Sequence, residues 1–212
     1  MKISRTLLLF IIIFITISSL YAKDAKDIIN DLKKEYDKVE NLSAEFTQEF
    51  YWKLAEQGQT QEGSIMLQGS DKFRIETRDQ IIVSDGKAIF TYSRMNNQVI
   101  IDAVTNNHEV VLPRELFMKF SKNYKPFMLE DEIINDTKCY VIRLTAKSAD
   151  MYIKEMKVWV DKKSNLTKKI QHTDISENVT TYTLKNIQLN QKLSPTLFKF
   201  KTPEGAETVD LR

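Results

Sequence analysis

Cysteine is almost absent from this chain, which limits the ways in which the fold can be held together. Cys139 is the single cysteine among 212 residues, so no disulfide can form within one chain. The 42% hydrophobic content is enough for one sizeable core. We therefore expect a single domain over residues 23–212, with Cys139 as a small buried hydrophobe on a strand.

The groups that most catalytic sites require are also scarce. There are two histidines, His108 and His172, and the sequence has no G-x-S-x-G, H-E-x-x-H or C-x-x-C motif and no glycine-rich phosphate loop. A catalytic triad need not be adjacent in sequence, so an esterase that uses His172 on envelope lipids stays open as a rival. We expect a protein that is not an enzyme and that binds no metal or cofactor.

The chain has no large excess of one charge. Its 31 basic and 29 acidic residues give a net charge of +2, and removal of Lys2 and Arg5 with the leader described below leaves 29 of each. A nucleic-acid-binding module carries a basic stripe, and none is present. No nucleic-acid partner is expected.

The first 22 residues have the pattern of a secretory signal. A positive start with Lys2 and Arg5 precedes an apolar run over residues 7–17, and Ala22 ends a plausible cleavage site. The run is shorter than the roughly 20 residues that span a bilayer. Because no cysteine follows Ala22, the product is not itself acylated. We expect a soluble exported protein, and an exported domain without disulfides fits a bacterial periplasm.

The rest of the chain is patterned mainly as β-structure. Apolar residues at helical spacing predict one amphipathic helix over residues 25–40, capped by Asp24. From Ser43 onward the period becomes two, with Gln48 interrupting an apolar face. Turns are predicted at 57–58, 69–71, 84–87 and 96–97, and Gly86 supplies a positive φ in the third of them. About eleven antiparallel strands result, which favours a curved sheet or barrel.

One segment breaks the alternation. Between Val104 and Glu132 the alternation stops, and Pro113 suits a first helical position. The residues at 116–120 and 124–129 that follow it are apolar nearly all round. We interpret residues 113–129 as helical cover that is either buried or lies over something apolar. Methionine and phenylalanine together give an adaptable surface that suits a flexible acyl chain. A helix that plugs a barrel mouth without any ligand is the alternative.

Several motifs, in order along nearly the whole chain, resemble the outer-membrane lipoprotein carrier family, LolA. They are residues 42–48 (LSAEFTQ), 71–74 (DKFR), 83–87 (VSDGK) followed by Phe90-x-Tyr92, and the terminal F-x-F-x-x-P-x-G from Phe198 with 209–212 (VDLR). The resemblance implies an incomplete eleven-stranded antiparallel barrel covered by about three helices. It also implies a periplasmic carrier of acylated lipoproteins, with an inner-membrane ABC transporter as donor and an outer-membrane receptor lipoprotein as acceptor. We expect a monomer.

The resemblance also carries residue roles. Phe50 and Met156 match cavity positions, Phe117 matches a lid position, and Phe73 matches the phenylalanine of a family motif R-P-x-x-F. Gly69 replaces the arginine of that motif, which ties the lid shut in the family. Together with the apolar strand faces and the expected cover, the predicted acyl-chain lining is Phe46, Phe50, Trp52, Ile65, Leu67, Phe73, Ile75, Phe90, Leu116, Phe117, Phe120, Phe127, Met128, Met156 and Val158, with Gly69 as a lid-coupling position.

The pattern leaves one alternative function. A binding module of the same architecture that senses envelope lipids or mislocalised lipoproteins would have the same apolar lining. Its partners would then be regulatory proteins and not a donor and an acceptor membrane.

Overall fold

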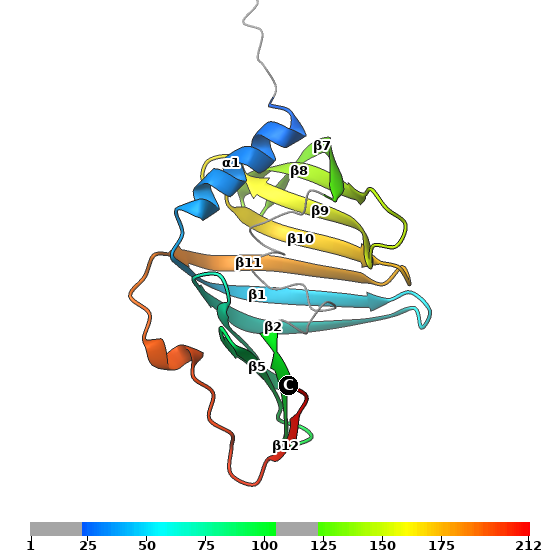
Figure 1. Ribbon diagram of the computed structural model, residues 1–212. Helices are drawn as coiled ribbons and strands as arrows, with labels where there is room; N and C mark the ends of the chain where they lie inside the picture. Colours follow the sequence, from blue (N-terminus) through cyan, green and yellow to red (C-terminus); the bar gives the residue numbers. More distant parts are fainter. Residues whose placement is uncertain (1–22, 105–122) are drawn as a thin grey trace, which may run out of the picture.

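A computed structural model describes residues 23–104 and 123–212 (Figure 1). The predicted signal segment therefore lies outside the described residues. The first described element is the helix α1, Ala25–Asp37. Asp24 caps it by accepting a hydrogen bond from the backbone N–H of Asp27 at 2.8 Å, as predicted. The buried residues of α1 are Ala25, Ile28, Ile29, Leu32 and Tyr36.

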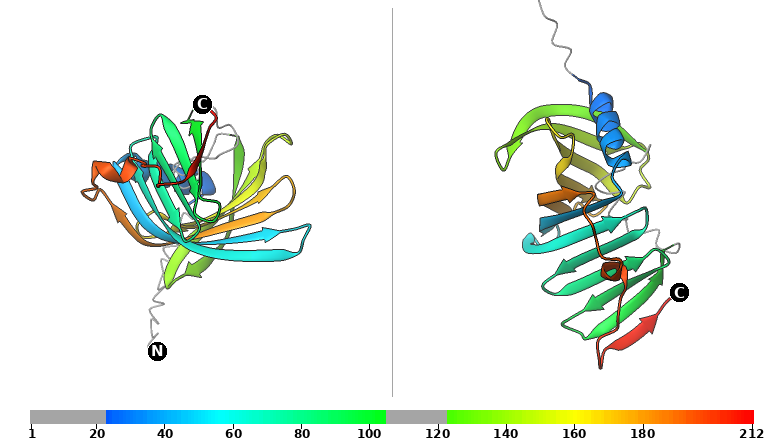
Figure 2. Two further views of the ribbon diagram at one scale, coloured as in Figure 1. Left: turned by 90° about the horizontal axis from the view of Figure 1, so that it is seen from below. Right: turned by 90° about the vertical axis from the view of Figure 1, so that its left-hand side faces the viewer.

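Twelve strands form one continuous sheet whose spatial order is β12-β6-β5-β4-β3-β2-β1-β11-β10-β9-β8-β7. All neighbouring pairs are antiparallel except β12 with β6, which run parallel. Figure 2 shows that the sheet is strongly curved and open, with β12 at one edge and β7 at the other. The strands are β1 (Asn41–Trp52), β2 (Gln57–Gln68), β3 (Lys72–Thr77), β4 (Gln80–Asp85), β5 (Ala88–Ser93), β6 (Gln98–Ala103), β7 (Tyr124–Ile134), β8 (Thr137–Ala146), β9 (Ile153–Asp161), β10 (Thr167–Asp174), β11 (Val179–Leu189) and β12 (Glu207–Asp210).

The sheet has two faces with different partners. The inner face is the one that carries Leu42, Ala44 and Phe46 of β1, and these side chains join the buried residues of α1 in the main core. Tyr36 of α1 also ties the helix to the sheet, because its hydroxyl accepts a hydrogen bond from the backbone N–H of Thr167 on β10. The outer face carries the intervening residues, beginning with Ser43 and Glu45.

The carboxyl-terminal segment covers part of the outer face. It passes through a short 3-10 helix, η2 (Pro195–Phe198), and ends in β12 beside β6 (Figure 1). Phe198 is buried, and the ring of Phe200 stacks on Phe90 with 5.3 Å between ring centroids. A second core of Ala88, Val99 and Ile101 lies beneath this contact. The segment therefore closes the β4–β6 end of the sheet from outside.

Three predictions about the elements need correction. The described residues contain one α-helix, not about three. Of the segment predicted as helical cover, residues 113–122 lie outside the described residues, whereas Tyr124 to Leu129 belong to strand β7. Pro126 is tolerated there because β7 is an edge strand. The turn expected at 57–58 lies earlier in the chain, at residues 53–56: Gln57 already pairs with Trp52, and Glu56 takes the positive φ of 51°.

Candidate functional site

The inner face of β1 changes character along its length. Leu42, Ala44 and Phe46 are buried, Gln48 and Phe50 are half-buried, and Trp52 at the hairpin end is 44% exposed. Strand alternation puts these even-numbered residues on one face. The ring of Phe46 packs edge-on against Tyr182 of β11, with 6.0 Å between the ring centroids. The rings of Phe50 and Trp52 also pack edge-on, with 4.5 Å between their centroids. An aromatic row thus runs from the core to the open end of the sheet.

Cross-strand register extends this surface over the neighbouring strands. Phe46 pairs with Gly63 of β2 and with Leu184 of β11. Farther along the sheet, Ile170 pairs with Val158, and Val158 pairs with Ile142. The apolar partners Leu184, Ile170, Val158 and Ile142 all belong to the main core. These four residues give the inner face an apolar stretch from β11 across to β8.

A polar group interrupts the inner face at the centre of the sheet. Gln61 of β2 donates from Nε2 to Oε1 of Gln48 at 2.5 Å, and Gln48 donates from Nε2 to the hydroxyl of Tyr182 at 3.2 Å. We call Gln61, Gln48 and Tyr182 the glutamine ladder. The register aligns them, because Gln48 pairs with Gln61 on one side and with Tyr182 on the other.

A pocket opens beside the ladder toward the hairpin end of β1 and β2. Its volume is about 280 Å³, and its walls combine three amide side chains with two aromatic rings. No carboxylate or cationic side chain is among its lining residues. The lining residues are Gln48, Phe50, Trp52, Gln59 and Gln61.

His172 of β10 lies next to the ladder. It pairs with Thr180 of β11 and Met156 of β9, and its ring stacks on Tyr182 with 6.3 Å between centroids. Its Nδ1 atom is buried and has no hydrogen-bond partner among the described residues. Burial lowers the pKa of His172 against the opposing attraction of Asp174. The imidazole is therefore held in its neutral form more strongly than a free histidine.

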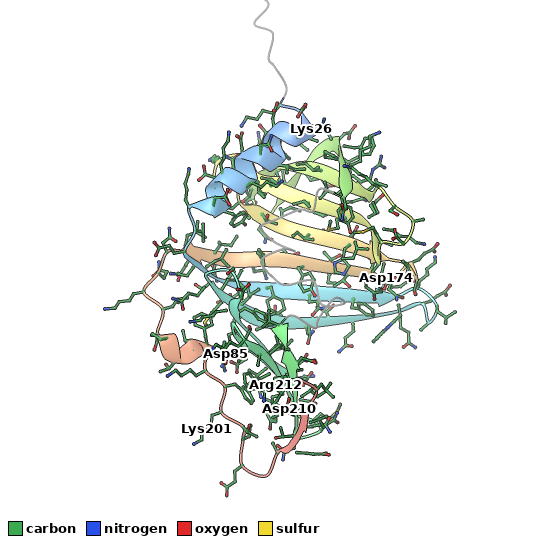
Figure 3. All side chains as sticks on the ribbon, in the orientation of Figure 1. Lys26, Asp85, Asp174, Lys201, Asp210 and Arg212 are labelled. Carbon is green, nitrogen blue, oxygen red and sulfur yellow. The ribbon has the colours of Figure 1, made fainter. Side chains whose placement is uncertain are left out.

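The carboxylate nearest to His172 in sequence is engaged elsewhere. Asp174 stands at the hairpin end of β10 (Figure 3) and accepts hydrogen bonds from the backbone N–H groups of Ser176 and Asn178 and from the side chain of Asn178. Asp174 thus shapes the turn between β10 and β11. Over residues 23–104 and 123–212, no group of three or more His, Cys, Asp or Glu side chains is arranged to hold a metal ion.

Most of the predicted lining residues on the strands share the inner face. Phe46, Ile65, Leu67, Phe73, Met156 and Val158 are buried in the main core, with Ile75 packed against it. Phe50 and Trp52 line the pocket. Met128 pairs with Ile142 and so lies on the inner face of the edge strand, 37% exposed. Leu116, Phe117 and Phe120 lie outside the described residues.

The structure does not bring Phe90 and Phe127 together with the others. Phe90 pairs with Val83 and Ile101, which places it on the outer face, where it packs against Phe200. Phe127 pairs with Arg143 on the outer face, and the guanidinium of Arg143 lies 5.4 Å from its ring centroid. Their assignment to the same surface as Phe73 is wrong. Side chains alternate between the two faces along a strand, and both Phe90 and Phe127 occupy positions that point to the outer face.

Gly69 lies in the turn between β2 and β3. Its backbone N–H donates to the carbonyl oxygen of Glu40 at 2.9 Å, and its φ of +61° belongs to the left-handed region. A Cβ built at this position meets no atom within 4 Å. The space would accept a side chain, whereas the backbone conformation favours glycine.

The comparisons with known proteins agree with this architecture. The model of the family described as outer membrane lipoprotein carrier protein LolA matches residues 37–201, which is most of the chain. The chain belongs to the LolA family. That Gly69 stands at the arginine of the LolA motif R-P-x-x-F, and Phe73 at its phenylalanine, stays a prediction.

Relatives within the LolA family align over nearly the whole chain. The outer-membrane lipoprotein carrier protein of Haemophilus influenzae (strain Rd) is 28% identical over 189 residues, which cover 88% of this chain and 88% of that protein. The protein of the same name from Haemophilus ducreyi is 25% identical over 214 residues, covering 100% of this chain and 97% of its own.

Solved structures with low identity share the fold. An uncharacterized conserved protein from Thermus thermophilus aligns with a TM-score of 0.58 at 12% identity, over 88% of this chain and 98% of its own. The crystal structure of MucB aligns with a TM-score of 0.51 at 12% identity, over 84% of this chain and 62% of its own. Among the described residues, no helix is both long and apolar enough to cross a membrane.

The glutamine ladder is the feature that sequence reasoning missed. In the sequence, Gln48 is visible only as a break in an apolar alternation. Its partners Gln61 and Tyr182 are 13 and 134 residues away, so the sequence pattern alone does not connect them.

Proposed function

We propose that this LolA-family chain is a periplasmic carrier that binds the acyl chains of lipoproteins leaving the inner membrane and delivers those lipoproteins to an outer-membrane acceptor. The observation that carries the proposal is the aromatic row on β1 within a LolA-family fold. Phe46 is buried, Phe50 is half-buried, and Trp52 is exposed at the open end. An acyl chain that enters at Trp52 can follow this row toward the core.

Energetics explain why such a surface has to be partly open. Burial of an acyl chain of about 15 methylenes contributes roughly 12 kcal/mol, at about 0.8 kcal/mol per methylene. Full burial of three such chains would exceed the affinity that non-covalent complexes reach. A carrier must release its cargo, so partial burial on an accessible face is the arrangement that fits the role. Transfer then follows an affinity gradient, without nucleotide bound to the carrier.

The partners follow from the same role. We propose an inner-membrane lipoprotein-releasing ABC transporter as donor and an outer-membrane receptor lipoprotein as acceptor, with the carrier acting as a monomer in the periplasm. The names of the Haemophilus relatives, outer-membrane lipoprotein carrier proteins, support the cargo class and the destination.

A release assay tests the proposal. Spheroplasts that contain a radiolabelled lipoprotein are incubated with purified protein of residues 23–212, and the supernatant is assayed for a soluble complex of the two. We expect release, followed by transfer of the label to outer-membrane vesicles. Failure to release any lipoprotein would overturn the carrier role, and release without transfer would favour the sensing module instead.

The assay has a matched pair of variants on one strand. Phe50 lies on the inner face beside the pocket, whereas Tyr51 lies on the outer face and is 40% exposed. Phe50→Glu should abolish retention of acylated cargo, because it places a charge in the acyl path. Tyr51→Glu introduces the same charge one residue away and should carry cargo as the parent does.

A further inference from the structure

The glutamine ladder lies at the boundary between two parts of the inner face. On β1 it is one inner-face position outward from Phe46, which is buried in the main core, and two inward from the exposed Trp52. Strand alternation gives these residues a common direction. A chain that follows the inner face of β1 from Trp52 to Phe46 therefore passes Gln48, with Gln61 beside it on β2.

The ladder leaves hydrogen-bonding capacity unused at Gln61, its end on β2. A glutamine amide offers two N–H donors and a carbonyl acceptor. Gln61 uses one donor toward Gln48, and among the described residues no hydrogen bond reaches its own carbonyl oxygen. Within that same part of the chain, the side chain of Gln59 makes no hydrogen bond either, although it lines the pocket. Donors and acceptors are thus available around the space of about 280 Å³.

The chemistry of the lining selects a neutral polar ligand. A hydrocarbon chain can neither donate nor accept a hydrogen bond, so amides are a poor lining for it. A phosphate or carboxylate is not matched either, because no cationic side chain lines the pocket and burial lowers the pKa of the adjacent His172. Ester and amide groups satisfy glutamine side chains without charge.

We propose that the glutamine ladder and the adjoining pocket bind the neutral, carbonyl-bearing junction at which the acyl chains of the cargo join its protein part. This inference rests on the proposed carrier function. The acyl chains then lie on the apolar inner face beyond Gln48, the junction lies at the amides, and the rest of the cargo lies outside, past Trp52. The ladder selects cargo by its linkage, whereas the apolar inner face inward of Gln48 holds the chains.

Two sources can supply the junction carbonyls. One is the pair of ester groups that link fatty acids to glycerol, and the other is the peptide backbone that follows the acylated residue. Both present neutral carbonyl oxygens close to the start of the acyl chains, and the peptide also presents N–H donors that match the free carbonyl oxygen of Gln61.

The test compares three probes on the full mature chain, residues 23–212. The probes are a synthetic dipalmitoyl-glyceryl-cysteine tetrapeptide, dipalmitoylglycerol, and a pyrene-labelled hexadecane that has no carbonyl group. Gln48→Leu and Gln61→Leu remove the ladder amides in turn. Gln171→Leu is the matched control, because Gln171 lies on the outer face, where it donates to Thr181 Oγ1 at 3.1 Å. Thermal unfolding of each variant verifies that it is folded.

We expect Gln48→Leu and Gln61→Leu each to bind the lipopeptide about five- to tenfold more weakly, as loss of a neutral hydrogen bond predicts, and the pyrene probe at least as tightly as the parent. Gln171→Leu should bind both like the parent. A parallel loss for dipalmitoylglycerol assigns the ladder to the ester groups, and a loss confined to the lipopeptide assigns it to the peptide. Unchanged lipopeptide binding, or equal weakening for the pyrene probe, would overturn the inference. A parent protein that binds none of the three probes would instead overturn the carrier proposal.

Discussion

The ring of Phe46 lies directly over Gly63, its cross-strand partner on β2. A Cβ built on Gly63 would stand 2.6 Å from Cζ of Phe46 and 2.5 Å from the carbonyl oxygen of Glu76 on β3. Neither contact is possible for real atoms. Glycine at this position therefore leaves room for the innermost aromatic ring of the row, one inner-face position from Gln48 of the glutamine ladder.

Gly63→Ala should lower the free energy of unfolding by about 2 kcal/mol, since overpacking of a filled site costs about 1–3 kcal/mol. Urea unfolding measures the effect. Gly58→Ala is the control on the same strand, because its Cβ would meet only the carbonyl oxygen of Phe50 at an ordinary 3.7 Å. Equal stability of the two variants would show that both the ring of Phe46 and the backbone at Glu76 move aside at no cost.

Phe90→Ala should destabilise the fold and leave cargo binding intact. Phe90 packs against Phe200 on the outer face, so its truncation removes contacts that hold the carboxyl-terminal segment. We expect a loss of about 2 kcal/mol, below the roughly 3–5 kcal/mol of a fully buried phenylalanine because Phe90 is half-buried. Urea unfolding and the lipoprotein release assay are measured on the same preparation. Loss of cargo retention in a folded variant would return Phe90 to the acyl-chain lining.

Much of the sheet could be predicted from alternation alone, and the failures of that prediction have a common cause. The helix capped by Asp24, the strand runs and the positive φ of Gly86 are local features, and all are found in the structure. Which parity faces inward is set by long-range register, so alternation alone puts Phe90 on the wrong face. The parallel pairing of β12 with β6 joins residues more than 100 apart, and no local pattern reports it.

The edge strand β7 is predicted as a helix for a different reason. Its sequence contains Pro126 within a continuous apolar run, a pattern that suits a capped helix as well as a strand on an open edge. The position of the strand in the sheet, and not its composition, decides between the two. The same applies to the glutamine ladder, whose members are separated by up to 134 residues.

We expect Gly69→Arg to slow release of cargo, because the resemblance to the LolA motif R-P-x-x-F implies that an arginine at this position ties the lid shut. The left-handed φ of +61° penalises any side chain by roughly 1–2 kcal/mol. Gly69→Ala carries the same backbone strain without the guanidinium, and it is therefore the control. Release kinetics of a loaded carrier separate the two variants. Identical release rates would show that the position is not coupled to a lid.

His172 should make the fold less stable in mild acid. Burial lowers its pKa in the folded state below the ordinary 6.5, so the unfolded chain binds more protons between those two values. The free energy of unfolding therefore falls as the pH drops from about 6.5 toward the folded pKa, and it is regained above 6.5. Urea unfolding between pH 5 and pH 7.5 measures this slope. His172→Gln should have a shallower slope, and parallel profiles would contradict the assignment.

The central claim is that acylated cargo lies on the inner face of the sheet, and two adjacent positions on β1 test it most directly. A photoreactive benzoylphenylalanine is placed at position 50 or at position 51, and the carrier is loaded from spheroplasts with a radiolabelled lipoprotein and irradiated. The account predicts a cross-link to the lipoprotein from position 50, beside the pocket, and none from position 51 on the outer face. Cross-links of equal yield from both positions, or from position 51 alone, would contradict it.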